Sequence, residues 1–476
     1  MLLSKIYGIE ISVGTDPLFK LDKLEIFEND IIGIVGKNGS GKTTLLNILS
    51  KELAPDAGYV KNYCGLSYFH QFNKYDEYEK YEKNEKNFSG GEITKSFLTK
   101  SLNKNAALLL LDEPTSNLDM ASINMLEKQI QNYNGAVVLI SHDRKLLENT
   151  CTRIVNIENR AAAVYECGYS GFIELKEKEA KRAVFLYEAY DKERKRLKES
   201  IQKAASRVKS ANKTPKRMGN SEARLHKRKT GERMESVEAG TQAQKTRLEK
   251  LEVHEKPKNP RKIGIGLENF KERYKGSYII ECDDLTVCFE GRTLFENADF
   301  RIATGKKTVI TGDNGSGKTT LIKKILDPGC KNIKLNAKKT AYYSQGLDIL
   351  NEEKTILENV IENSSFTELE ARNILGRLDI REDNVYKKVK NISGGEKVKV
   401  CFAKIFTFGA DLVILDEPTN YLDIDTTMVL EDIIQEYDGT ILAVSHDRSF
   451  AENISDSFIE IDAGKKKIKY HDVKYN

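Results

Sequence analysis

The chain has 476 residues, too many for one ordinary domain and enough for two or three. Hydrophobic residues make up 39% of it, but no stretch of about 18 uncharged apolar residues occurs, so the sequence predicts no membrane span. The net charge is +4 and the seven cysteines form no CxxC pair, which favours a cytoplasmic protein with reduced thiols and no cysteine-bound metal.

A glycine-rich loop follows the first predicted buried strand. Residues 31–36 (IIGIVG) are typical of such a strand, and the apolar periodicity of 43–53 predicts a helix. The loop between them can surround phosphates with backbone N–H groups and the positive end of the helix. We predict phosphate binding by Gly36, Lys37, Asn38, Gly39, Ser40, Gly41, Lys42, Thr43 and Thr44. Lys42 should reach the β and γ phosphates, and Thr43 should ligate Mg²⁺.

Acidic residues and a histidine follow the next apolar runs. Residues 108–112 (LLLLD) and 136–141 (AVVLIS) are continuous enough to be central parallel strands covered on both faces. Asp112 ends the first run, so its carboxylate should lie beside the metal, and Glu113 is placed to activate or orient water. His142 follows the second run and can bond the γ-phosphate. Taken singly, an Asp-Glu pair is usually solvated surface and such a histidine is usually structural.

Residues 173–260 differ in composition from the rest of the chain. Within 173–257 there are 24 Lys and Arg against 14 Asp and Glu. Apolar positions recur at steps of three and four on both sides of Pro215 and Gly219, which predicts an antiparallel coiled coil with its tip near that break. About 40 residues at 1.5 Å each would place the tip ~60 Å from the base.

The predicted tip is the most basic part of the chain. Residues 201–230 hold ten Lys and Arg and one acid, a composition that favours phosphate backbones. The alternative is a solvated helical hairpin that binds no nucleic acid. The apolar residues nearest the break, Met218 and Leu225, could either enter a pocket of a partner or pack between the two helices. The candidate contacts are Lys213, Lys216, Arg217, Met218, Arg224, Leu225, His226, Lys227 and Arg228.

The motifs of the first part return in the same order after the linker. The second phosphate loop would comprise Gly312, Asp313, Asn314, Gly315, Ser316, Gly317, Lys318, Thr319 and Thr320. Asp416, Glu417 and His446 repeat the acidic pair and the histidine, while Gln71 and Gln345 each precede an SGGE run. The glutamines are 274 positions apart and the SGGE runs 304, so the first copy is about 30 residues shorter. Because five motifs recur in the same order, the alternative that each is an ordinary surface or structural residue is disfavoured.

This ordered set resembles the ABC ATPase superfamily over roughly 1–172 and 270–476. The resemblance implies two ATP molecules sandwiched between the domains, with both sites active. One site would pair Lys42, Thr43, Gln71, Asp112, Glu113 and His142 with Ser393, Gly394 and Gly395. The other would pair Lys318, Thr319, Gln345, Asp416, Glu417 and His446 with Ser89, Gly90 and Gly91. The Mg²⁺ ligands would include Gln71 and Gln345, and Phe289 would stack on adenine where the first copy has Val13.

The run LDEPTNYLDI (415–424), the basic linker and the lack of a membrane segment resemble the ABC-F family. The predicted architecture is α/β: two P-loop ABC ATPase domains, 1–172 and 261–476, joined by a coiled-coil linker, 173–260. The resemblance implies a monomer at the E site of the bacterial 70S ribosome, with the linker near 23S rRNA and P-site tRNA. Only 17 residues separate Gln71 from Ser89, too few for the arm of some members.

Several functions stay open at this point. The trimmed first domain and basic hairpin look most like the antibiotic-resistance branch, which displaces lincosamides, streptogramins A or pleuromutilins. A housekeeping translation factor would carry the same motifs. A transporter ATPase has no use for so long a basic hairpin, and a DNA-repair or chromosome-structural ATPase typically has zinc modules or longer coils.

Overall fold

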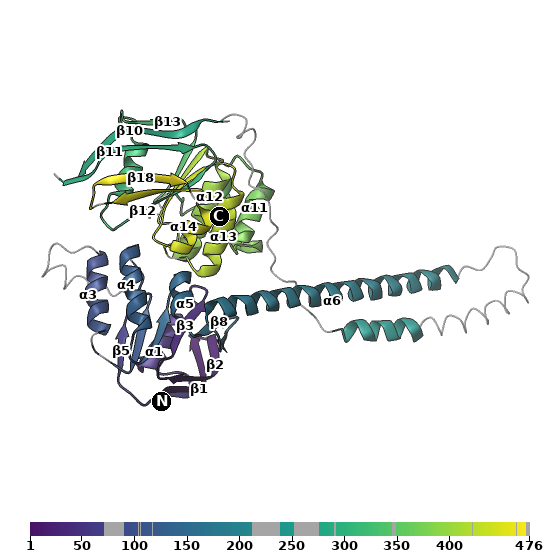
Figure 1. Ribbon diagram of the computed structural model, residues 1–476. Coiled ribbons are helices and arrows are strands. Elements are labelled where there is room, and N and C mark those ends of the chain that lie inside the picture. The colour runs from purple at the N-terminus through teal and green to yellow at the C-terminus, as the bar shows by residue number, and fades with distance from the viewer. Residues whose placement is uncertain are drawn as a thin grey trace, which may run out of the picture. The chain divides into compact units, whose positions relative to one another are not determined.

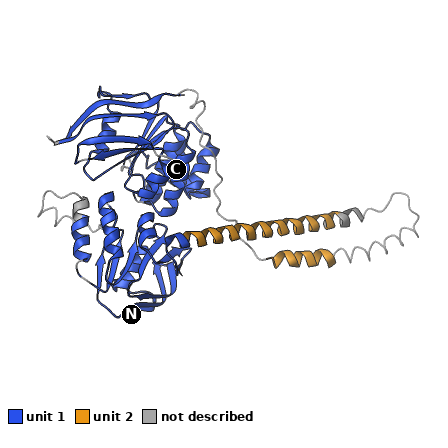
Figure 2. Ribbon diagram, in the orientation of Figure 1, with its two compact units in different colours: residues 1–172, 260–476 blue, residues 173–259 orange. Residues whose placement is uncertain are grey.

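The computed structural model describes residues 1–70, 90–102, 104, 106–116, 118–211, 239–251, 276–289, 292–344, 349–420, 422–462 and 464–472. The chain divides into two compact units (Figure 2). Unit 1 comprises residues 1–172 and 260–476, which we call its first and second halves, and unit 2 comprises residues 173–259.

The first half is built on one mixed sheet with the strand order β4-β1-β2-β9-β8-β3-β7-β6-β5. Its strands are β1 (Leu2–Val13), β2 (Asp16–Phe27), β3 (Ile31–Gly36), β4 (Ala57–Asn62), β5 (Leu66–Phe69), β6 (Leu108–Asp112), β7 (Ala136–Ile140), β8 (Arg153–Glu158) and β9 (Ala161–Tyr165). Its helices are α1 (Lys42–Ser50), α3 (Gly90–Leu102), α4 (Met120–Gln131) and α5 (Arg144–Thr150) (Figure 1).

The second half repeats this plan with two sheets, ordered β11-β10-β13 and β14-β15-β16-β12-β17-β18. Its strands are β10 (Tyr278–Phe289), β11 (Arg292–Ala303), β12 (Lys307–Gly312), β13 (Ile333–Leu335), β14 (Thr340–Tyr343), β15 (Leu412–Asp416), β16 (Thr440–Val444), β17 (Ser457–Asp462) and β18 (Lys467–Asp472). Its helices are α9 (Lys318–Leu326), α10 (Ile356–Ile361), α11 (Glu368–Arg377), α12 (Gly394–Thr407), α13 (Ile424–Glu436) and α14 (Arg448–Ile454), with 3-10 turns η1 (Glu382–Tyr386) and η2 (Val389–Asn391).

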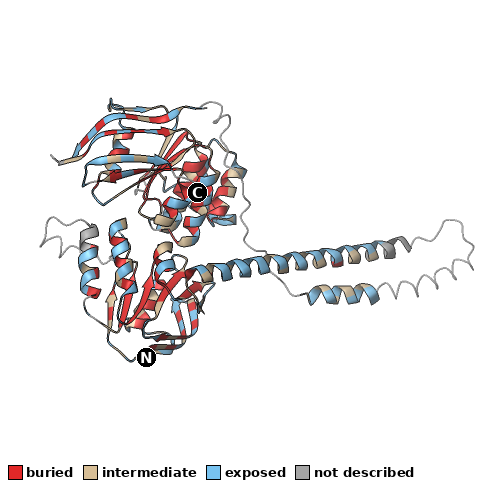
Figure 3. Ribbon diagram, in the orientation of Figure 1, coloured by how far each residue is buried: buried red, intermediate tan, exposed pale blue. Residues whose placement is uncertain are grey.

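The parallel strands β6, β7, β15 and β16 are buried along their whole length (Figure 3). In β15, Val413 and Leu415 pack into a core with the helices α10 to α13, whereas Leu412 and Ile414 pack into a core with β10 and β11. Because both faces are covered, every position favours an apolar side chain, which explains the continuous apolar runs in the sequence. The α/β prediction is confirmed.

Helices α10 and α11 lie between β14 and the SGGE segment of the second half. Each begins with a capping box, formed by Thr355 with Glu358 and by Thr367 with Glu370. Their buried faces join the same core as α12. The extra length of the second sequence copy therefore includes a small packed helical layer rather than an extended loop.

Unit 2 contains α6 (Tyr169–Ala211) from residue 173 onward and a second helical run over residues 239–249. A guanidinium nitrogen of Arg247 lies 3.0 Å from a carboxylate oxygen of Glu193, which joins the two segments. On the predicted seam of α6, Leu197 is buried, while Thr241, Gln244 and Leu248 are half-buried on the returning segment. The paired segments agree with a hairpin; its coiled-coil geometry stays a prediction.

Within the part of the chain that the structure describes, no helix combines the length and apolar character needed to cross a membrane.

Candidate ATP sites

Each glycine-rich loop connects the carboxyl end of a buried parallel strand to a helix, β3 to α1 and β12 to α9. Gly36 and Gly312 open the loops with φ values of 149° and 150°. A Cβ atom at Gly36 would lie 2.4 Å from the carbonyl oxygen of Ile157, and one at Gly312 would lie 2.7 Å from that of Ile461. Only glycine fits here, because the loop folds tightly against the neighbouring strand.

The side chains of Lys42 and Lys318 bind the backbone of their own glycine-rich loops. The ammonium of Lys42 donates to the carbonyl oxygens of Gly36 and Lys37 at 2.8 and 3.1 Å, and Lys318 makes the equivalent contacts in the second half. Burial lowers the pKa of Lys42, while nearby carboxylates, chiefly Glu113, oppose this shift. The lysine is thus held at the loop by weak neutral acceptors, which a phosphate oxygen can replace with a stronger charged bond.

Asp112 and Asp416 end the strands β6 and β15, as the sequence predicts. Both carboxylate oxygens of Asp112 are buried and have no hydrogen-bond partner among the described residues. Burial raises the pKa of this carboxyl to about 6, a shift that the Thr43 side chain opposes. The Thr319 hydroxyl donates to Asp416 at 3.1 Å.

A buried carboxylate next to a threonine suits a hard cation with oxygen ligands, so Asp112 with Thr43 and Asp416 with Thr319 fit Mg²⁺. When bound, Mg²⁺ would neutralise phosphate charge.

Glu113 and Glu417 adopt left-handed backbone conformations, with φ of 49° and 50°. This region is unfavourable for a residue with a Cβ atom and is concentrated at functional sites. The conformation is held by the adjacent parallel strands, because the N–H groups donate to the carbonyl oxygens of Ile140 and Val444, each at 3.0 Å. Both glutamates are therefore fixed immediately beyond the strand ends.

Each glutamate lies against the histidine of the next strand. Nε2 of His142 is 3.2 Å from Oε1 of Glu113, and Nε2 of His446 is 3.3 Å from Oε1 of Glu417. Burial lowers the pKa of both histidines to about 4 and raises the pKa of both glutamates to about 7. The histidines are thus neutral near pH 7, where the glutamates can gain or lose a proton, as a base for water requires.

Other predicted site residues lie at ordered positions. Ser393 caps α12 through a capping box with Glu396, and Gly394 and Gly395 form its first turn; Gly90 and Gly91 begin α3. Phe289 and Val13 occupy the same place in their hairpins, pairing with Arg292 and Asp16, and are 56% and 66% exposed. The exposed ring of Phe289 is available for stacking. The pairing of these groups with ATP stays a prediction.

Some predicted residues fall outside the described part of the chain. They are Gln71, Ser89 and Gln345 of the ATP sites, and Lys213, Lys216, Arg217, Met218, Arg224, Leu225, His226, Lys227 and Arg228 of the linker tip.

Comparison with known proteins places this arrangement in a family. The ABC transporter family model matches residues 19–67 and 295–420. The ribosome protection protein VmlR of Bacillus subtilis is 32% identical over 95% of this chain and 86% of its own. ABC transporter F family member 5 of Arabidopsis thaliana is 33% identical over 79% of this chain and 52% of its own. The chain belongs to the ABC-F family.

A solved structure extends the agreement to the fold. The archaeal ribosome recycling factor aABCE1, in complex with ribosomal stalk protein aP1, has a TM-score of 0.64 and 18% identity, covering 97% of this chain and 89% of that one. This ABC-F protein is an ATP hydrolase with two ABC domains.

A set of contacts between the two halves of unit 1 was not predicted from the sequence motifs. The backbone N–H of Asn38, in the first glycine loop, donates to Asp423 at 3.2 Å, and Asp423 also caps α13. Arg144 pairs with Glu431 of α13, and Arg448 pairs with Glu127 of α4 at 2.9 Å. The sequence holds one indication of these contacts. Arg144 and Arg448 end the two SHDR motifs, and Asp119 and Asp423 end NLD and YLD, so all four residues recur in both copies.

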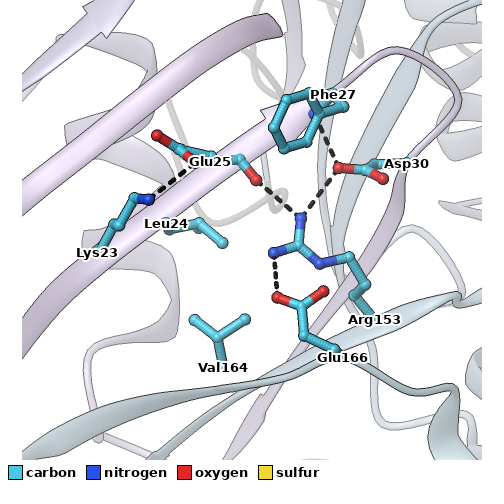
Figure 4. Close-up of a pocket in the computed structure, with 8 residues that line it drawn as sticks. All are labelled: Lys23, Leu24, Glu25, Phe27, Asp30, Arg153, Val164 and Glu166. Carbon is cyan, nitrogen blue, oxygen red and sulfur yellow. Dashed lines mark hydrogen bonds and ion pairs between the residues drawn. The ribbon is translucent and has the colours of Figure 1, made fainter.

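A pocket in the first half lies apart from these motifs (Figure 4). Arg153 donates to the carbonyl oxygen of Glu25 at 2.8 Å, to Asp30 at 3.0 Å and to Glu166 at 2.6 Å. Its guanidinium is therefore committed to tying β2, β8 and β9 together. This pocket offers no free Arg153 charge for a phosphate ligand.

Proposed function

We propose that this ABC-F protein binds the bacterial ribosome in its ATP-bound state and protects it from antibiotics at the peptidyl-transferase centre. The observation that carries the proposal is the similarity to the ribosome protection protein VmlR, which spans 95% of this chain. The drugs would be of the lincosamide, streptogramin A or pleuromutilin type. A housekeeping translation factor is the alternative within the same family.

The ATP cycle would control ribosome binding through the two halves. In each site one half would supply the glycine loop, the aspartate and the glutamate, while the other would supply SGGE. The contact of Asn38 with Asp423 supports such composite sites, since it joins a glycine loop to the opposite half. ATP would hold the protein at the E site, and water activated by Glu113 and Glu417 would release it.

The linker would be the ribosome-facing part. It contains helical segments over Tyr169–Ala211 and 239–249, which are joined by the ion pair of Glu193 and Arg247. The ten Lys and Arg of residues 201–230 would contact 23S rRNA and P-site tRNA through phosphates. A single chain carries both ATPase halves, so a monomer suffices.

The first test is co-sedimentation of a Glu113→Gln/Glu417→Gln protein with bacterial ribosomes. Without the activating carboxylates the ATP-bound state should persist, so we expect ATP-dependent pelleting. The control is the same protein without nucleotide. No pelleting by a variant that demonstrably retains ATP would remove the proposal, whereas pelleting without drug protection in susceptibility tests would favour the housekeeping factor.

Neutralising the linker tip should change how salt affects this binding. The variant would carry glutamine at Lys213, Lys216, Arg217, Arg224, Lys227 and Arg228. Because each phosphate contact contributes about one unit to the slope of log K against log salt, we expect weaker binding and a slope smaller by several units. Glutamine at Lys176, Lys178 and Lys181, near the base of α6, is the control. An unchanged slope would count against the tip as an RNA contact.

A further inference from the structure

The outer side of the strands β4, β1 and β2 carries exposed tyrosines. Tyr7 and Tyr59 are 54% and 51% exposed, and their ring centroids lie 6.0 Å apart. Tyr63, just beyond β4, is 45% exposed, with the ammonium of Lys61 5.1 Å from its ring centroid. We call this surface the tyrosine face; it consists of Lys5, Tyr7, Lys23, Glu25, Tyr59, Lys61 and Tyr63.

Strand register brings these side chains together. Tyr7 on β1 pairs with Tyr59 on β4 and with Lys23 on β2, while Lys5 pairs with Lys61 and Glu25 in the same way. The residues between them point into the core: Ile6 is fully buried. Since side chains alternate along a strand, the tyrosine face is the solvent side of a layer whose other side holds the fold together.

The tyrosine face has an excess of positive charge. Glu25 is its one acid and pairs with Lys5 at 3.1 Å and Lys23 at 3.0 Å. The ammonium of Lys61 lies over the ring of Tyr63, so this cation is placed directly beside an aromatic surface. Lys23 and Glu25 also line the pocket in Figure 4, so the surface is hollowed along β2.

The second half offers an internal comparison, because β13, β10 and β11 repeat the same three-strand layer. There Glu281 pairs with Lys334 and Arg301, just as Lys5 pairs with Lys61 and Glu25. The backbone N–H of Asp283 donates to the carbonyl of Asn332, so these two residues replace the facing tyrosines. The side chain of Asp283 is 70% exposed. The layer therefore folds with polar residues at the two facing positions, although it carries one exposed aromatic residue, Tyr278, with the Arg301 guanidinium carbon 5.9 Å from its ring centroid.

We propose that the tyrosine face binds an unpaired segment of RNA, with tyrosine rings stacked on bases and lysines near phosphates. Stacking needs exposed aromatic planes, which Tyr7 and Tyr59 supply where the second half has Asp283 and Asn332. An RNA backbone needs cations beside those planes, and Lys5, Lys23 and Lys61 lie there. The inference rests on the proposed ribosomal function and adds an RNA contact separate from the linker tip.

The test measures the affinity of the full chain for a fluorescein-labelled single-stranded RNA of about 12 nucleotides, by fluorescence anisotropy. Replacing Tyr7→Ser and Tyr59→Asn removes both rings without changing the charge. We expect binding to weaken about 10-fold, since each stacked base contributes several-fold in affinity. ATP turnover should be unchanged, because neither tyrosine belongs to an ATP site.

Two matched proteins separate stacking from other causes. Tyr7→Phe/Tyr59→Phe keeps the rings and should bind as the parent does, and Tyr278→Ser, at a tyrosine 45% exposed in the second half, should have no effect. Unchanged RNA affinity in the Tyr7→Ser/Tyr59→Asn protein overturns the proposal. So does loss of ribosome pelleting with RNA affinity intact, which would indicate a protein partner. Tyrosine-dependent RNA binding without any ribosome pelleting would keep this inference and remove the ribosomal function.

Discussion

Replacing Glu113 and Glu417 by glutamine is expected to reduce steady-state ATP turnover by about 100-fold or more, the usual contribution of a positioned general base. Each glutamate is held in a left-handed conformation beyond a buried strand and lies within 3.3 Å of a neutral histidine. Glutamine keeps the shape and the hydrogen bonds of glutamate but cannot take a proton from water. The measurement is phosphate release at saturating ATP, with ATP binding checked separately.

The single variants add information that the symmetric geometry does not contain. If both sites turn over equally and independently, Glu113→Gln and Glu417→Gln should each retain about half of the rate. If the sites act together, either change alone should approach the loss in the double variant. Normal turnover in the double variant would show that neither glutamate is the base.

The strands and the glycine-rich loops could be predicted from the sequence, because the residues that determine each of them lie next to one another in the chain. The helix predicted over 43–53 forms as α1 but ends at Ser50, because Lys51 adopts a left-handed conformation that stops it. The strand at residues 31–36 is confirmed as β3. The same holds for Asp112 and Asp416, each the last residue of a strand with an uninterrupted apolar run. Here the chain's own sequence determines both the element and the place of the side chain.

Other features depend on residues distant in sequence. The left-handed φ of Glu113 is held by a hydrogen bond to Ile140 on the neighbouring strand, and nothing in a DE pair signals that contact. The tyrosine face arises because Tyr7 and Tyr59 meet across two strands, whereas the alternation of β1 alone only separates a buried side from an exposed one. Strand pairing, not local pattern, creates both.

The contacts of Arg144 and Arg448, the arginines that follow the histidine motifs, are the main part of the structure that the sequence did not predict. Arg144 is 287 residues from Glu431, and Arg448 is 321 residues from Glu127. In sequence these arginines look like ordinary first-turn residues of short helices, capped by Asp143 and Asp447. Only the arrangement of the two halves of unit 1 reveals their reciprocal partners on α13 and α4.

Breaking the Arg144–Glu431 pair should therefore impair ATP hydrolysis more than the loss of a surface ion pair. Nη1 of Arg144 donates to Glu431 at 3.1 Å, and the two side chains are only 11% and 8% exposed. Arg144→Met leaves the carboxylate buried without its partner, which typically costs about 3–5 kcal/mol. We expect kcat/KM for ATP to fall at least about 10-fold, because composite sites need both halves in place.

A double-mutant cycle separates this contact from general damage. Arg144→Met/Glu431→Met removes both charges, so its kcat/KM should lie above that of Arg144→Met alone, since no buried charge is left unpaired. The exposed pair Lys20–Glu10, with side chains 57% and 53% exposed at 2.8 Å, is the matched control, and Lys20→Met should change kcat/KM by less than about 2-fold. Strictly additive losses in the cycle would mean that the pair does not couple the halves. A higher kcat/KM in the double variant than in Arg144→Met would instead show that the Arg144–Glu431 pair couples the two halves. Arg144 would then be the residue that holds the segment after His142 against α13 of the opposite half.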